Sequence, residues 1–125
     1  MVKNILLVGL GGGFGSICRY LMQKWIYDIY PHPFPLGTFL VNVLGCFAIG
    51  VIYGAAEKSN VLNFEWRLLL TTGICGGFTT FSTFAFENVV LLRGGNVTYF
   101  LLYIGLSVTV GIGAVFGGIA IIKFL

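Results

Sequence analysis

The sequence predicts an all-α integral membrane protein with four transmembrane helices. The 125 residues are 58% hydrophobic and only 9% charged, whereas a soluble domain carries about 25% charged residues. Four apolar segments have the length of about 20 residues that a helix needs to cross a bilayer. The connections between them are short, so we expect a single four-span membrane domain over residues 1–125.

The four expected spans follow one another closely along the chain. The first covers about residues 5–26 and is interrupted by Arg19. The second and the fourth, about residues 37–56 and 97–122, are uncharged, and the third covers about residues 67–92. Residue types that favour turns mark the three connections: Pro31, Pro33, Pro35, then Asn60 and Asn63, then Gly94-Gly95-Asn96.

The centre of the third span is unusual for a membrane helix. It combines two adjacent glycines, four hydroxyl side chains and three phenylalanines in Gly76-Gly77-Phe78-Thr79-Thr80-Phe81-Ser82-Thr83-Phe84. Glycine permits unusual backbone, and non-helical backbone at membrane depth is tolerated only where it is buried in protein or lines a wet cavity. We therefore expect a helix broken at its centre, the arrangement with which membrane proteins build ion and substrate sites.

Three polar side chains near span depth have more than one interpretation. Asn42 lies in the middle of the second span and either makes an interhelical hydrogen bond or lines a pathway as a donor. Arg19 is either an interfacial anchor or part of a positive vestibule that attracts an anion. Glu87 is expected to pair with Arg19 or Lys24, to cap a half-helix, or to act as a gate.

Aromatic rings alternate with hydroxyl groups in the broken segment. A Phe stripe on a membrane helix usually packs or contacts lipid, but ring edges are positive. Together with hydroxyl and amide donors, the ring edges of Phe78, Phe81 and Phe84 would offer weak, multiple anion sites, as conduction requires. Freed backbone carbonyls near residues 76–80 provide oxygen ligands for a hard cation such as Na⁺.

Basic residues give almost no preferred orientation under the positive-inside rule. One side of the membrane receives four of them and the other three: Lys3, Lys58, Arg67 and Lys123 against Arg19, Lys24 and Arg93. Insertion in both orientations would allow an antiparallel, dual-topology homodimer, in which the polar residues of one copy face the other. Glycines four residues apart predict close helix packing: Gly11/Gly15, Gly50/Gly54, Gly73/Gly77 and Gly113/Gly117.

Other functions find less support in the residues. The net charge of +3 is small and dispersed, so nucleic acid is not an expected partner. No nucleophile–base pair or metal-ligand cluster is evident, so we do not expect an enzyme. The lone histidine, His32, lies in the proline-rich connection with no evident partner in the sequence. We therefore do not expect it to be a ligand or part of a proton relay.

Three motifs resemble those of the Fluc fluoride-channel family, also called CrcB, and the resemblance covers essentially the whole chain. The first span has the glycine-rich start that ends in Arg19-Tyr20, and the second has the asparagine motif around Asn42. The third span matches the family signature almost letter for letter from Thr71 to Phe84. One departure is Ala85, where the family often has serine.

The resemblance implies a dual-topology homodimer with two pores that exports fluoride passively and protects the cell from its toxicity, in an inner or plasma membrane. It implies that Phe81 and Phe84 are pore phenylalanines and Asn42 the pore asparagine. It also implies further lining by Ser82, Thr83, Tyr103 and Ser107, a vestibule near Arg19, and a structural Na⁺ at the dimer interface, held by the carbonyls of Gly76 and Thr79.

Two alternatives remain open at this point. A small multidrug or cation exporter is also a four-span, dual-topology dimer, but it needs a membrane-embedded carboxylate, and Glu87 lies near a span end. A non-transporting subunit of a larger complex would leave the hydroxyl groups and the Asn42 amide at mid-membrane unexplained.

Overall fold

The structure, a computed structural model, describes residues 1–59 and 62–125. Its four long helical segments are α1 (Val2–Ile29), α2 (Leu36–Lys58), a composite third segment over Phe64–Arg93, and α6 (Val97–Lys123). Each is long and apolar enough to cross a membrane. The expectation of an all-helical, four-span chain is confirmed. The observed helices contain the expected spans and extend a few residues beyond them.

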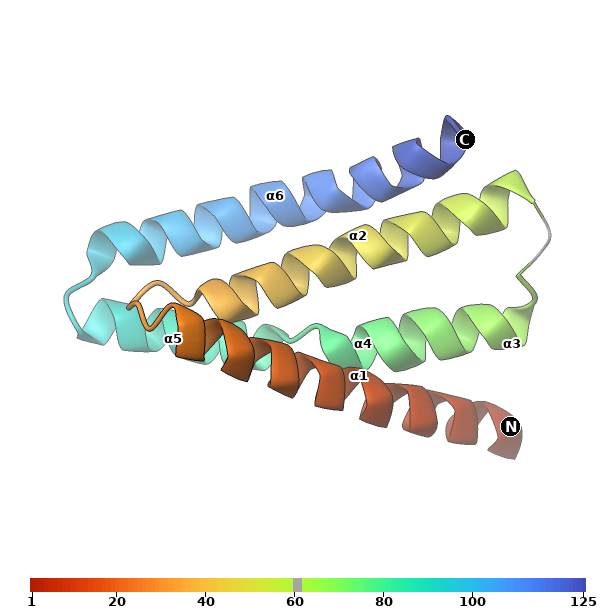
Figure 1. Ribbon diagram of the computed structural model, residues 1–125, viewed down its shortest axis with the longest axis horizontal. Helices are drawn as coiled ribbons and strands as arrows, with labels where there is room; N and C mark the ends of the chain where they lie inside the picture. Colours follow the sequence, from red (N-terminus) through yellow and green to blue (C-terminus); the bar gives the residue numbers. More distant parts are fainter. Residues whose placement is uncertain (60–61) are drawn as a thin grey trace.

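The four segments run alongside one another, and both termini lie at the same end of the molecule (Figure 1). Residues 30–35 and 94–96 make the two connections at the opposite end. The second of these is a tight turn in which Gly95 has φ +79°, a left-handed conformation that favours glycine. Asn60, expected to mark a turn between the second and third spans, lies outside the described residues.

The third segment consists of four short pieces. They are α3 (Phe64–Arg67), the π-helix η1 (Leu68–Cys75), α4 (Gly76–Phe78) and α5 (Phe81–Arg93). The break lies between α4 and α5, where Thr79 (φ −84°, ψ 158°) and Thr80 (φ −150°, ψ 124°) are extended. The expected central break is therefore present, and within it only the two threonines have extended backbone.

The glycines before the break do not supply unusual backbone, so that part of the sequence argument is wrong. Gly76 has helical backbone angles (φ −62°, ψ −39°). Gly77 is instead required by close packing, since a Cβ there would overlap the carbonyl oxygen of Gly12 on α1. The segment is broken by the hydrogen bonds of its threonines, described below.

Close backbone contact defines two helix pairs, in which α2 packs along α6 and α1 packs against η1 and α4 (Figure 1). A Cβ at Gly50 would overlap the carbonyl oxygen of Val115 in the first pair, and one at Gly15 would overlap that of Ile74 in the second. Three of the four expected glycine pairs therefore pack within one chain. Gly113 and Gly117 form the fourth pair and face open space.

Candidate functional site

The side chain of Asn42 on α2 binds the broken backbone of the third segment. Its Nδ2 donates to the carbonyl oxygen of Thr80 over 3.1 Å, and its Oδ1 accepts the N–H of Thr80 over 2.9 Å. One amide side chain therefore satisfies both backbone groups of a residue that has left the helix. The interhelical interpretation of Asn42 is supported, and one of its two amide hydrogens remains for another acceptor.

Asn42 also determines where the broken helix leaves carbonyl groups available. In a continuous α-helix the N–H of Thr80 would donate to the carbonyl of Gly76; here it donates to Asn42. Gly76 is exposed on the surface of the chain. The carbonyl of Thr79 accepts a hydrogen bond of 3.3 Å from Nη1 of Arg19. This places Arg19 beside the break, bound to backbone, rather than free in a vestibule.

Thr80 also forms the N-terminal cap of α5. Its Oγ1 accepts the N–H of Thr83 over 3.3 Å and lies 3.3 Å from the Thr83 hydroxyl and 3.5 Å from that of Ser82. Such a cap satisfies one of the free N–H groups at a helix start. The hydroxyl groups of Ser82 and Thr83 thus belong first to the cap cluster.

A cavity of about 320 Å³ opens at the break. We call it the break cavity. Of the residues that the sequence singled out for a pathway, it contains Asn42, Phe81, Phe84 and Ser107. Thr79, expected to bind Na⁺ through its carbonyl, and Thr80 also line it. Ser82, Thr83 and Tyr103 do not line it.

The hydroxyl of Ser107 gives the break cavity an unused polar group. Its Oγ is buried, and it has no hydrogen-bond partner among the residues that the structure describes. A buried hydroxyl without a partner costs free energy. A ligand or water in the cavity would remove that cost.

Aromatic rings form one wall of the break cavity. The ring centres of Phe81 and Phe84 are 5.8 Å apart, and Phe84 is 4.8 Å from Tyr103 on α6. Phe81 is 78% exposed, whereas Tyr103 is fully buried. The outward position of Phe81 leaves most of its ring available to lipid or to a second copy of the chain.

Tyr103 donates its hydroxyl to Oε1 of Glu87 over 3.1 Å. Of the alternatives considered for Glu87, the pairing with Arg19 or Lys24 is therefore wrong. Arg19 binds the carbonyl of Thr79, and Lys24 binds Asp28 over 3.0 Å. Both basic side chains thus have other partners, and the Glu87 carboxylate accepts its hydrogen bond from the neutral hydroxyl of Tyr103.

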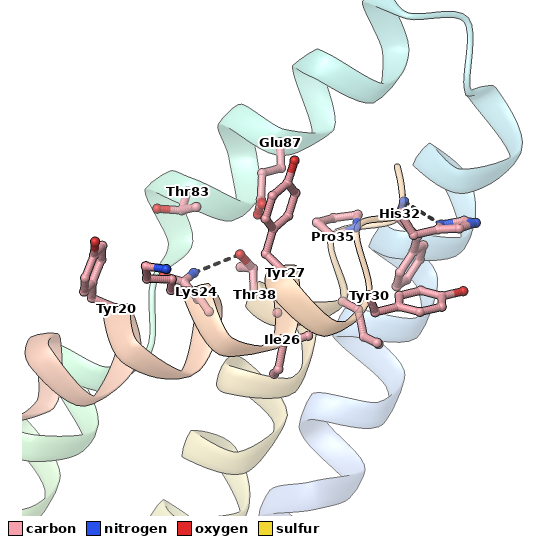
Figure 2. A pocket seen from close by; sticks show the side chains of 14 residues that line it. Tyr20, Lys24, Ile26, Tyr27, Tyr30, His32, Pro35, Thr38, Thr83 and Glu87 are labelled. Carbon is pink, nitrogen blue, oxygen red and sulfur yellow. Dashed lines mark hydrogen bonds between the residues drawn. The ribbon is translucent and has the colours of Figure 1, made fainter.

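A second cavity of about 370 Å³ lies toward the connection at residues 30–35. We call it the loop-side cavity. Figure 2 shows Thr83 and Glu87 on α5, with Lys24 and Tyr27 on α1 and Thr38 on α2, among the residues that line it. Thr38 accepts a hydrogen bond of 2.9 Å from Gln23, drawn as a dashed line.

The two cavities follow each other along the same helices. Thr38 in the loop-side cavity is one turn from Asn42 in the break cavity on α2. On α5, Glu87 in the loop-side cavity is three residues from Phe84 in the break cavity. The Tyr103–Glu87 hydrogen bond lies between them, because the Tyr103 ring contacts Phe84.

Sequence reasoning missed Thr80 and Thr38. A signal for Thr80 exists, since a threonine just before an apolar helical run is typical of a helix N-cap. Thr38 could have been noted as one turn before Asn42 on the same face of a helix. The partner of Asn42 could not be read from the sequence, because it is backbone 38 residues away.

The fold and the site define a class of protein: a multi-pass membrane protein with a polar, phenylalanine-walled cavity at a broken helix, as in channels and transporters. The family model described as CrcB-like protein, Camphor Resistance (CrcB), matches residues 6–119. The chain belongs to this family.

Similar proteins cover nearly the whole chain. The fluoride-specific ion channel FluC of Leptospira interrogans (strain Fiocruz L1-130) is 46% identical over 97% of this chain and 95% of its own length. FluC of Phocaeicola vulgatus is 49% identical over 94% of this chain and 97% of its own. FluC of Azobacteroides pseudotrichonymphae is 44% identical, with 99% of both chains covered.

Proposed function

We propose that this protein is a fluoride-selective ion channel that lets fluoride leave the cell passively and so lowers its internal concentration and toxicity. The observation that carries the proposal is the break cavity, which brings Asn42, Phe81, Phe84 and Ser107 together in a chain whose similar proteins are fluoride-specific channels. It is an ion channel and not an enzyme, and a multidrug exporter is not favoured.

The proposed pathway uses both cavities. Fluoride enters the loop-side cavity, passes the Glu87–Tyr103 hydrogen bond and reaches the break cavity. The Glu87 carboxylate would repel an anion in the pathway. The hydrogen bond from Tyr103 holds this carboxylate to one side and so reduces the repulsion. We therefore assign Glu87 a gating role at this constriction, and Thr83 a place in the lining on its outer side.

The groups in the break cavity suit a small anion. The unpartnered hydroxyl of Ser107 and the second amide hydrogen of Asn42 donate hydrogen bonds, and the edges of Phe81 and Phe84 are weakly positive. No Lys or Arg side chain lines the break cavity among the described residues. Weak neutral donors release an anion readily, which fast conduction requires.

A structural Na⁺ fits the residues at the break. The carbonyl of Gly76 has lost its helical donor to Asn42, and Gly76 is exposed; the carbonyl of Thr79 uses one of its two lone pairs for Arg19. Carbonyl oxygens are ligands of hard cations. Gly76 and Thr79 would hold the ion, and two copies of the pair would supply four oxygens. The bound ion would fix the two breaks to each other.

An antiparallel homodimer completes this arrangement. Its support is the nearly equal count of basic residues on the two sides and the outward position of Gly76 and Phe81, which the described residues of one chain leave exposed. The expected mass of the purified assembly without detergent and lipid is twice 13.6 kDa. A single cysteine at Asn96, in a variant without the three native cysteines, should be labelled from both sides of an inner or plasma membrane.

The function is tested by fluoride efflux from liposomes that contain the purified protein. Liposomes loaded with potassium fluoride receive a potassium ionophore, and an electrode follows external fluoride, with potassium chloride liposomes in parallel. Rapid fluoride release without chloride release is the expected result. Equal release of both ions would contradict selectivity, and no release from folded protein would contradict the proposal.

A further inference from the structure

His32 has partners that the sequence did not reveal. It lies in the connection between α1 and α2, at one end of the molecule, and lines the loop-side cavity (Figure 2). The backbone N–H of Phe34 donates to its Nδ1 over 3.1 Å, and the Tyr99 hydroxyl lies 3.4 Å from its Nε2. Tyr30 stacks on the ring with centres 5.1 Å apart. Both ring nitrogens are therefore engaged.

The hydrogen bond from Phe34 assigns the protonation state of the ring. A backbone N–H can only donate, so Nδ1 of His32 accepts and carries no proton. The ring is then the neutral imidazole with its hydrogen on Nε2, directed at the Tyr99 oxygen. In the imidazolium form both nitrogens carry hydrogen. Two N–H groups would then face each other at Nδ1, and the bond to Phe34 would be lost.

Aromatic contacts connect this hydrogen bond to the break cavity. The Phe34 ring packs edge-on against Tyr103 with centres 5.5 Å apart. Tyr103 is fully buried, contacts Phe84 at 4.8 Å and donates to Glu87. Each link is a contact between packed groups, so the position of Phe34 affects the group that holds the Glu87 carboxylate.

We propose that His32 is a positioning residue for fluoride conduction, which it supports only in its neutral form. Neutral His32 holds Phe34 against Tyr103 and keeps Tyr103 on Glu87; protonated His32 releases Phe34, and conduction falls. The proposal rests on the proposed function, and it adds acid inhibition to it. Histidine is the side chain that gains its proton between pH 5 and 8, and this chain has one histidine.

The other titratable groups near His32 come from every element around it. Tyr30 and Tyr99 contact the ring, and Tyr20, Tyr27 and Lys24 of α1 and Glu87 of α5 line the same cavity. Lys24 is paired with Asp28 over 3.0 Å. Glu87 is held by Tyr103, on the pathway side of the cavity. A test must therefore distinguish a pH effect that acts through His32 from one that acts through Glu87.

Two substitutions make that separation. His32→Asn places an amide oxygen that accepts from Phe34 without titrating, whereas His32→Phe keeps the ring without an acceptor. Both variants leave Glu87 unchanged. Fluoride currents in planar bilayers are compared at pH 8 and pH 5.5, with the leak current of protein-free bilayers subtracted.

We expect the parent current to fall about threefold to tenfold between pH 8 and pH 5.5, the factor that one lost hydrogen bond supports. His32→Asn should keep its current at both pH values, and His32→Phe should be low at both. A parent current that does not change with pH, or a pH response of the His32→Asn variant equal to the parent's, would overturn the proposal. If the parent shows no current at any pH, the proposed function fails instead.

Amide hydrogen exchange tests the hydrogen bond to Phe34 directly, whether or not the protein conducts. The N–H of Phe34 should be protected at pH 8 and lose protection, after correction for the intrinsic rate, at pH 5.5 in the parent protein. In His32→Asn the protection should persist. Equal protection of Phe34 at both pH values in the parent would overturn the proposal.

Discussion

Asn42 and Thr80 exchange two hydrogen bonds, 2.9 and 3.1 Å long, between a side chain on α2 and a backbone unit of the broken third segment. In a membrane every backbone polar group needs a partner, so irregular backbone survives only where protein supplies one. Asn42 supplies both for Thr80. The same contact turns Thr80 into the cap of α5 and frees the carbonyl of Gly76.

Replacement of Asn42 by Ala should destabilise the break. The N–H and C=O of Thr80 would lose their partners, and an unsatisfied buried polar group costs about 1–3 kcal/mol. We expect a lower free energy of unfolding in detergent by about that amount, together with loss of fluoride efflux. Val43→Ala, on the next residue of α2, lines neither cavity and is the control. Unchanged stability in Asn42→Ala would contradict the role of the two hydrogen bonds.

Ser107→Ala should separate function from stability. The Ser107 hydroxyl is buried without a protein partner among the described residues, so its removal should leave the free energy of unfolding unchanged or raise it. Fluoride efflux should fall roughly tenfold, because a donor worth about 1.4 kcal/mol to the ion is lost. Thr109→Val removes a hydroxyl from the same helix outside both cavities and should conduct normally. A Ser107→Ala protein with parental efflux would show that the hydroxyl does not contact fluoride.

Tyr103→Phe should expose the effect of the Glu87 carboxylate. The ring keeps its contact with Phe84, but the donor to Glu87 is gone. We expect fluoride efflux to fall, and Glu87→Gln in the same protein to restore part of it, because the neutral amide repels no anion. The coupling of the two substitutions in unfolding should be about 0.5–3 kcal/mol, as for residues in contact.

Additive effects of Tyr103→Phe and Glu87→Gln on both efflux and unfolding would argue against this link. Tyr53→Phe provides the matched control, since Tyr53 lies outside both cavities near the other end of α2. It loses the same atom from the same residue type and should behave as the parent protein.

Much of the fold could be predicted because a membrane-spanning helix requires a long apolar segment that can be recognised in the sequence. Apolar length indicated the four spans, and the mixture of hydroxyl groups, glycines and rings indicated the central break. The reason for the break was misjudged, because glycine at residues 76 and 77 also fits helical backbone in close packing. Gly77 is needed for contact with Gly12, which only the arrangement of α1 against α4 reveals.

The candidate site could be predicted as a set of residue types but not as a set of pairs. Asn42, Phe81, Phe84 and Ser107 do share one cavity. The partner of Glu87 depends on which helix faces α5, so the sequence left Arg19, Lys24 and a capping or gating role open and did not identify the Tyr103 hydroxyl that it binds. Partners from distant segments follow from packing, which a single sequence does not state.

The measurement that tests the central claim most directly compares two phenylalanines of the break cavity with a third on the same helix, α5, in one fluoride-efflux assay. Phe84→Ile and Phe81→Ile remove ring edges from the break cavity, whereas Phe86→Ile changes an exposed ring that lines neither cavity. We predict that the first two abolish efflux although the variant proteins still fold, and that Phe86→Ile conducts at the parent rate. Parental efflux from Phe84→Ile and Phe81→Ile would contradict the assignment of the break cavity as the fluoride pathway.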